Sequence, residues 1–277
     1  MTNSVRYVGE ETRGLSPAIW KDFLKERAAD PSSIAFFFDD FGNFSQEISA
    51  QNIAQYASYI DTGVTIKSLA VQDLSEGEHG ILEIAGNDAD NDEGSITTGG
   101  NVGTIGLISD TAAQAKRLAF ECRIKKASVD DNACAFFVGL SEEGLAAADT
   151  LVDNTGELAD KDFCGFRVKQ DNGEELDFAW SKAGDATAVQ EHAALTSLVA
   201  DTWVKLGFLY DPDAPTAKRI KIFIDGVEQT SYVTGAQIAA ATFPDGEELA
   251  LLLATKVGTA AESKFQMDWW AFGQMLD

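Results

Sequence analysis

The 277-residue chain has little cysteine, histidine or proline: three cysteines, two histidines and five prolines. Cys122, Cys134 and Cys164 lie far apart without a C-x-x-C pair, which excludes a disulfide scaffold and predicts buried free thiols. His79 and His192 lack the spacing of metal ligands, so we expect no zinc site. The few prolines argue against long extended linkers.

Positive charge is also scarce, since 21 Lys and Arg face 45 Asp and Glu, a formal net charge of −24. Such a surface repels phosphate backbones, so we expect no nucleic-acid partner. The longest apolar run, 249–254, has the length of a strand and is far shorter than the roughly 18 residues of a membrane helix. We therefore expect no membrane partner either. The odd cysteine count, and the lack of a signal peptide after Met1, favour synthesis in a reducing cytoplasm.

The sequence lacks complete catalytic motifs. No Walker loop occurs, and Gly139–Glu143 lacks the second glycine of a nucleophile elbow. Glucan hydrolases with a concanavalin A-like fold carry E-x-D-x-E or E-x-D-x-x-E on one strand, because alternate residues share a face and flank the sugar. Here Glu175 and Asp177 match, but Ala179 and Trp180 occupy the places of the third acid. We expect no enzyme activity and no catalytic residue, and we interpret this strand face as solvated.

An amphipathic helix is predicted near the N-terminus. Ser16-Pro17 is typical of a helix start, and the helix should end before Asp30-Pro31 after two to three turns. Its apolar stripe must dock on the main domain, which we favour, or on another subunit. The candidate partner-binding residues in this predicted arm, residues 1–33, are Ile19, Trp20, Phe23 and Leu24.

From residue 34 onward, period-two alternation and turn residues predict about ten strands. The clearest are 34–38, 80–85, 118–125, 134–140, 163–169, 175–180, 203–210, 220–224 and 264–272. In 118–125, Leu118 and Phe120 alternate with Glu121 and Arg123, which is typical of a half-buried antiparallel strand. Residues 51–60 carry a weak helical pattern. Asp171-Asn-Gly173 is the strongest hairpin signal.

Two neighbouring segments suggest the fold. Trp203–Tyr210 and Ile220–Glu228, the second broken by an Asp225-Gly226 turn, resemble the laminin-G and concanavalin A-like group of β-sandwiches. The resemblance implies an all-β, two-sheet antiparallel sandwich, or jelly roll, over residues 34–277. That fold hosts lectins, glycosidases and structural shells, so it does not choose a function.

The acidic loop 87–94 raises the question of a bound cofactor. Asp88, Asp90 and Asp92 alternate as calcium ligands of an EF-hand do, but Gly94 comes one place late and Gly99 stands where the closing glutamate belongs. We expect a solvated turn and no cofactor, with an irregular calcium site as the alternative.

Tryptophans could stack on sugars. Period-two alternation places Trp180 and Trp269 with the core residues of their strands, whereas it places Trp270 out of line with them. We therefore expect Trp270 on the opposite face of the last strand or in a subunit contact, with a glycan platform as a third alternative. It completes the candidate partner-binding set.

A narrower resemblance is carried by loose motifs: Phe37–Phe41, Asp90–Ser95 before Thr98–Gly100, the 203–226 strand pair and Met267–Trp269. Together they resemble tailed-phage (bacteriophage) virion proteins with a concanavalin A-like domain. The resemblance implies a non-enzymatic capsid decoration or cement protein. It would bind and stabilise the shell of the major capsid protein at the capsid surface as a homo-oligomer, with a trimer as one candidate. The alternative is a carbohydrate-binding, lectin-like or receptor-binding domain, or a degenerate glycoside hydrolase.

Overall fold

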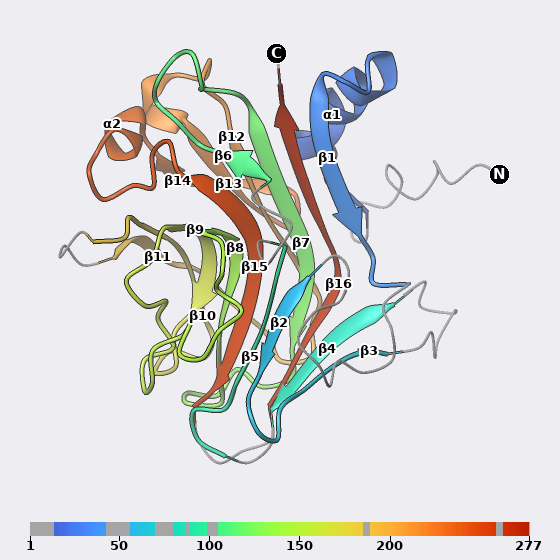
Figure 1. Cartoon of the computed structure of the whole chain (residues 1–277), viewed down its shortest axis with the longest axis vertical. Helices are drawn as coiled ribbons and strands as arrows, with labels where there is room; N and C mark the ends of the chain where they lie inside the picture. The colour runs from blue at the N-terminus through green and yellow to red at the C-terminus, as the bar shows by residue number, and fades with distance from the viewer. Residues whose placement is uncertain are drawn as a thin grey trace.

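The computed structural model describes residues 14–42, 56–69, 80–86, 89–98, 105–184, 189–258 and 263–276. These residues form two antiparallel sheets packed face to face, with helix α1 (Pro17–Ala29) lying beside strand β1 on the outside (Figure 1). The predicted two-sheet sandwich and its short N-terminal helix are confirmed. The boundary at residue 33 between an arm and the sandwich stays a prediction.

The first sheet has the order β14-β13-β12-β7-β16-β4-β3, and β1 pairs with β16. Its strands are β1 (Ile34–Asp39), β3 (Thr65–Leu69), β4 (Ile81–Gly86), β7 (Leu118–Lys126), β12 (Val204–Tyr210), β13 (Ile220–Ile224), β14 (Val227–Val233) and β16 (Ser263–Met275).

The second sheet has the order β11-β10-β9-β8-β15-β5-β2, and β6 pairs with β15. Its strands are β2 (Ala57–Ile60), β5 (Glu93–Thr97), β6 (Gly106–Leu107), β8 (Cys134–Ser141), β9 (Phe163–Val168), β10 (Glu175–Ser181), β11 (Gln190–Ser197) and β15 (Glu248–Val257). Two short helical turns, η1 (Thr216–Lys218) and α2 (Gly235–Ile238), lie in the connections around β13 and β14.

The nine strands singled out in the sequence are all present, and the described residues contain sixteen. The Asp225-Gly226 turn joins β13 to β14, and φ is positive at both residues, 51° and 76°. A two-residue hairpin turn of type I′ requires positive φ at both positions, and its twist matches that of the flanking strands. The helical expectation for residues 51–60 is wrong in its described part, because Ala57–Ile60 pairs with β5 as a strand.

The core lies between the sheets and is strongly aromatic. Phe166 and Phe178 from the second sheet meet Phe208 from the first, with the Phe178 and Phe208 ring centroids 5.4 Å apart. Cys122 and Cys164 lie in the same core, and all three cysteines are buried and free, as predicted.

Helix α1 begins at Pro17 and ends before Asp30, as predicted. Ile19, Trp20 and Phe23 are almost fully buried against the outer face of the first sheet, so the apolar stripe docks on the chain's own sandwich. This contact overturns the expectation of a half-buried β7. Glu121 and Arg123 on its outer face are buried as well, at 0% and 6% exposure.

The expected faces of the last strand are also wrong. The register of β16 against β7 shifts between Met267 and Trp269, which is a β-bulge that turns the following side chains over. Trp270 therefore joins Met267 in the core at 0% exposure, and Trp269 packs on the outer face beside Phe38. A bulge is invisible to period-two counting because it inserts one residue without changing residue types.

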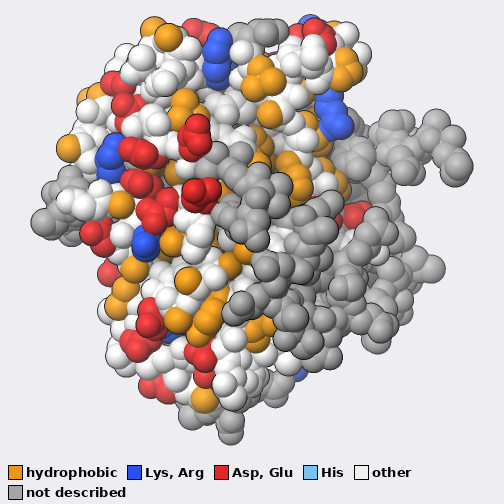
Figure 2. Space-filling view, in the orientation of Figure 1, with side chains coloured by type: hydrophobic (Ala, Val, Ile, Leu, Met, Phe, Trp, Pro, Cys, Tyr) orange, Lys and Arg blue, Asp and Glu red, His pale blue; other side chains and the backbone are white. Residues whose placement is uncertain are grey.

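In the part of the chain that the structure describes, neither helix combines the length and the apolar character needed to cross a bilayer. Acidic side chains are spread over the face shown in Figure 2, with a few lysines and arginines between them.

Candidate functional site

The two acids of the E-x-D fragment lie on the outer face of the second sheet. Glu175 is half-buried, and Asp177 is 1% exposed, so the expectation of a solvated face is wrong for Asp177. The Asp177 carboxylate accepts the Ala194 N–H at 2.9 Å and lies 3.5 Å from Lys169 Nζ and 3.7 Å from Arg167 Nε. Asp177 is therefore part of an ion-pair network with Arg167 and Lys169.

Arg167 connects this network to two further acids. It donates a hydrogen bond to Glu191 and lies 3.4 Å from Glu157. Burial opposes ionisation of Glu191, but the hydrogen bond and charge of Arg167 bring its pKa below the usual range. A glycoside hydrolase needs one carboxyl that keeps its proton as general acid. The acids around Arg167 are instead arranged as its counter-ions.

The outer face of the second sheet is also covered. Leu145, Leu151 and Leu158, from the segment between β8 and β9, pack on Phe137 and Phe163 of the sheet. Below them the buried Lys256 ammonium lies 3.3 Å from Glu93 and 2.6 Å from Asp153 of the covering segment. These contacts cover the part of the outer face around Phe137, Phe163 and Lys256.

The calcium candidates are only partly placed. Asp88 lies outside the described residues, Asp90 is exposed and Asp92 is half-buried. Among the residues that the structure describes, no group of three or more acidic, histidine or cysteine side chains could hold a metal ion. Glu93, directly after this turn, begins β5 and is 1% exposed, so the solvated turn ends before it.

The candidate partner-binding side chains are not surface residues. Ile19, Trp20 and Phe23 are at most 2% exposed, and Leu24 is half-buried against the same cluster. Trp270 is 0% exposed. In this conformation these side chains hold the chain together and leave little for a partner to contact.

The remaining tryptophans do not form an open sugar platform. Trp180 is in the core, as predicted. Trp203 is half-buried, and its ring already receives two cations: the Arg123 guanidinium at 4.5 Å from the ring centre and the Lys125 ammonium at 4.8 Å.

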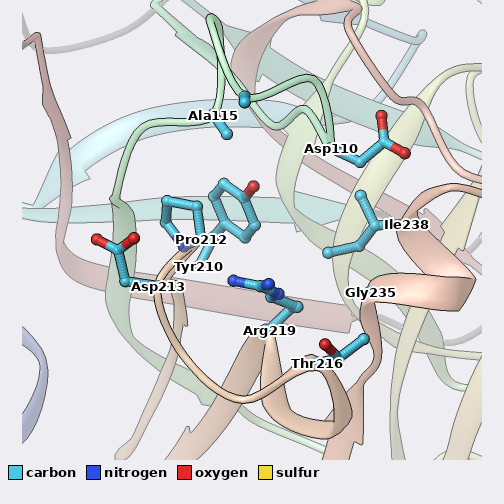
Figure 3. A pocket seen from close by; sticks show the side chains of 10 residues that line it. Asp110, Ala115, Tyr210, Pro212, Asp213, Thr216, Arg219, Gly235 and Ile238 are labelled. Atoms are coloured by element: carbon cyan, nitrogen blue, oxygen red, sulfur yellow. The ribbon is translucent and has the colours of Figure 1, made fainter.

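A pocket of about 400 Å³ lies around Tyr210 and Arg219 (Figure 3). Four segments build it: the connection before β7, the end of β12, the β12–β13 loop with η1, and the start of α2. We call it the Arg219 pocket. It is lined by Asp110, Ala112, Ala115, Tyr210, Pro212, Asp213, Thr216, Arg219, Gly235 and Ile238.

Arg219 lies in the middle of this pocket, with the Tyr210 and Pro212 rings beside it and Asp213 and Asp110 toward its two sides (Figure 3). Its Nη1 is buried without a hydrogen-bond partner, and no described carboxylate lies within 4.0 Å of its guanidinium. A buried donor without a partner is costly. Arg219 therefore has a hydrogen-bond donor that no described residue accepts.

Neighbouring contacts fix the walls. The Tyr210 hydroxyl donates to the Ser109 carbonyl, and burial raises the pKa of Tyr210 to about 12, so it is a neutral donor that is already engaged. Gly235 is needed for close packing, because a Cβ there would lie 2.9 Å from Thr216 Cγ2. The Thr234–Gln237 capping box fixes the start of α2 beside it.

Sequence reasoning missed this pocket. Its polar residues come from loops without a motif, and only the folded chain brings Asp110 to Asp213 and Arg219. The one available signal was the cluster Lys218–Lys221 in a strongly acidic chain.

Comparison with solved structures assigns the fold. The crystal structure of a protein of unknown function from Shewanella oneidensis MR-1 is 15% identical, with a TM-score of 0.54 over 90% of this chain and 93% of that one. The endo-1,3-beta-glucanase from Streptomyces sioyaensis is 11% identical, with a TM-score of 0.55 over 88% and 98%. The Emp47p carbohydrate recognition domain is 12% identical, with a TM-score of 0.52 over 88% and 97%.

These likenesses, together with that to peanut lectin, make the fold a concanavalin A-like lectin and glucanase sandwich, as the sequence resemblance implied. No family model and no curated protein matches the sequence.

Proposed function

We propose that the protein is a non-hydrolytic, carbohydrate-binding domain and that its saccharide site is the Arg219 pocket. The unpartnered, buried Nη1 of Arg219 carries this proposal. The volume of about 400 Å³ lies within the roughly 300–1,000 Å³ typical of small-molecule sites.

The pocket suits a neutral, hydroxyl-rich ligand. Arg219 only donates hydrogen bonds and the Asp213 carboxylate only accepts them, so a ligand that faces both side chains must do both. Sugar hydroxyls do, and the apolar faces of Pro212 and Ile238 match the C–H face of a pyranose. A simple anion would suit Arg219 but would be repelled by both aspartates and by the net charge of −24.

The structural neighbours support the same class of ligand. Their names include a carbohydrate recognition domain, a lectin and an endo-1,3-beta-glucanase. The absence of hydrolysis is part of the proposal, and it is supported by Arg167 and Lys169 neutralising Asp177 and by Ala179 in place of an acid.

Isothermal titration calorimetry with neutral β-glucan oligosaccharides tests the proposal. We expect saturable binding that changes little between 50 and 500 mM salt, because the ligand is uncharged. Arg219→Leu should weaken binding at least about tenfold, since a hydrogen bond from a charged group contributes roughly 1.5–3 kcal/mol. Lys218→Leu is the matched control, because Lys218 bonds Tyr232 and is not part of the pocket wall.

No binding of any neutral glycan across an array would overturn the proposal. So would unchanged affinity in Arg219→Leu once its thermal unfolding shows that it is folded. Binding only of anionic sugars, with affinity that falls steeply as salt rises, would contradict the neutral class.

A capsid decoration protein is the second candidate. It is supported by the sequence resemblance that residues 34–277 carry. Its partners would be the major capsid protein and further copies of this chain. Deleting residues 1–13 leaves α1 and its buried contacts in place, unlike deletion of residues 1–33. Loss of particle association in that shorter deletion would support an anchoring N-terminus, and retention would exclude it.

A further inference from the structure

A second hollow of about 470 Å³ lies next to the Arg219 pocket. It is formed by the turn after β10 and by the connection between α2 and β15. Three consecutive alanines contribute to its wall, so much of it consists of backbone and methyl groups. We call it the alanine hollow. It is lined by Lys182, Ala183, Gly184, Ala239, Ala240, Ala241, Phe243 and Asp245.

The two sites adjoin in the chain and in space. Ile238, at the end of α2, lines the Arg219 pocket, and the next residue, Ala239, lines the alanine hollow. Asp110 of the first site donates its backbone N–H to the Asp245 carboxylate of the second at 2.8 Å. Hydrogen bonding and charge from the Asp245 carboxyl raise the pKa of Asp110. A carboxyl pair therefore marks the junction.

Side-chain and backbone contacts fix the wall of the alanine hollow. The Lys182 ammonium lies 2.9 Å from Glu247 Oε1 and donates a hydrogen bond to the Asp245 carbonyl at 3.5 Å. Phe243 is fully buried and supports the connection from below, with its N–H bonded to the Ala240 carbonyl at 3.0 Å. The rest of its floor consists of alanine methyl groups and backbone, and carboxyl oxygens are available at the junction with Asp110.

From this arrangement we infer that the saccharide site is extended: a linear, neutral oligosaccharide places one sugar unit in the Arg219 pocket and the next in the alanine hollow, crossing the Asp110–Asp245 junction. This inference rests on the proposed function and adds the size of the ligand. The apolar floor receives the C–H face of the second unit, and the junction carboxyls accept hydrogen bonds from hydroxyls on either side of the glycosidic bond.

Chain-length dependence of binding tests the inference, with glucose, cellobiose, cellotetraose and laminaritetraose as probes in calorimetry. At least one tetrasaccharide should bind the wild type about tenfold or more tightly than glucose. Ala239→Trp fills the alanine hollow and should abolish that gain while leaving the affinity for glucose unchanged. Ala236→Trp, at an exposed α2 position outside both walls, is the matched control.

The experiment distinguishes failure of the proposed function from failure of the extended site. If no probe binds, the proposed function fails and the extended site fails with it. If glucose and the tetrasaccharides bind with equal affinity, or if Ala239→Trp keeps the full gain, the extended site is overturned while a single-sugar pocket stands. Equal losses in Ala239→Trp and Ala236→Trp would show a nonspecific effect on α2 and would also overturn it.

Discussion

The indole Nε1 of Trp20 donates a hydrogen bond of 2.8 Å to Glu121 Oε2, and both side chains are fully buried. The same carboxylate oxygen accepts the Ser16 N–H at 2.9 Å. The nearby Lys205 ammonium donates to Ser16 Oγ at 2.9 Å and to the Gly14 carbonyl at 3.1 Å. Hydrogen bonds among buried polar groups thus hold the start of α1 on the first sheet, and apolar side chains surround them.

Trp20→Phe tests this fastening. Phenylalanine keeps most of the apolar contact but removes a donor from a buried carboxylate whose pKa is already raised by burial. We expect the free energy of unfolding to fall by about 1–3 kcal/mol. Urea unfolding measures it, and Lys21→Ala, at the neighbouring exposed position, should change it by less than about 0.5 kcal/mol. An equal effect of both substitutions would contradict the importance of the hydrogen bond.

The cluster also shows what the sequence could and could not predict. Period-two alternation assigned Leu118 and Phe120 to one face of β7 and Glu121 to the other, and the pairing confirms this. Alternation says which side chains share a face, but not whether that face is covered. Glu121 and Asp177 were both expected in solvent, and both are buried. The start of α1 packs on Glu121, whereas Asp177 is enclosed by Arg167, Lys169 and Ala194 of the neighbouring strands and their connections.

The site was beyond sequence reasoning for a related reason. The strand pair 203–224 predicted the fold because strands and turns are local features. The Arg219 pocket joins Asp110 to residues about a hundred positions later, and no local pattern encodes that proximity. The prediction of which faces Trp269 and Trp270 occupy was wrong because one bulged residue reversed the alternation.

Substitutions of Arg167 and Asp177 should have coupled effects on the free energy of unfolding. Arg167→Met removes the guanidinium from the buried Asp177 carboxylate and should cost about 3–5 kcal/mol, since one buried charge loses compensation. Arg167→Met combined with Asp177→Leu should cost less than the single Arg167→Met substitution. A double-mutant cycle in urea measures this coupling, and additive losses would contradict it. All variants, like the wild type, should release no reducing sugar from β-1,3- or β-1,4-glucan.

Glu93 should make stability depend on pH. Burial raises its pKa from 4.5 to about 7 despite the nearby Lys256 ammonium, so the folded state holds this proton more tightly than the unfolded chain. The resulting stabilisation is fully present below about pH 4.5 and is lost as pH rises through about 7. The difference between 4.5 and about 7 corresponds to at most about 3.4 kcal/mol of stabilisation.

Glu93→Gln removes that titration. Between pH 5 and pH 8, its free energy of unfolding should decrease by about 2–3 kcal/mol less than that of the wild type, as measured by urea unfolding at both values. Glu175→Gln is the matched control, because it removes a half-buried acid from the same face of the same sheet. Parallel pH profiles for Glu93→Gln and wild type would contradict the raised pKa.

Substitution of Trp270 tests whether this residue is part of the core or forms a subunit contact. Its indole Nε1 donates to the Tyr56 hydroxyl at 3.1 Å, and its ring packs 5.9 Å from Phe41 and 5.6 Å from Tyr56 between centroids. Trp270→Ala should therefore cost about 3–5 kcal/mol of unfolding free energy at any protein concentration. Trp203→Ala, which removes a half-buried tryptophan from the outer face of the first sheet, should cost less.

If Trp270 were a subunit contact, Trp270→Ala would instead lower the oligomeric state in sedimentation equilibrium and would lose little stability at low protein concentration. The packing of Trp270 against Phe41 and Tyr56 predicts an unchanged oligomeric state, because no part of its side chain reaches the surface.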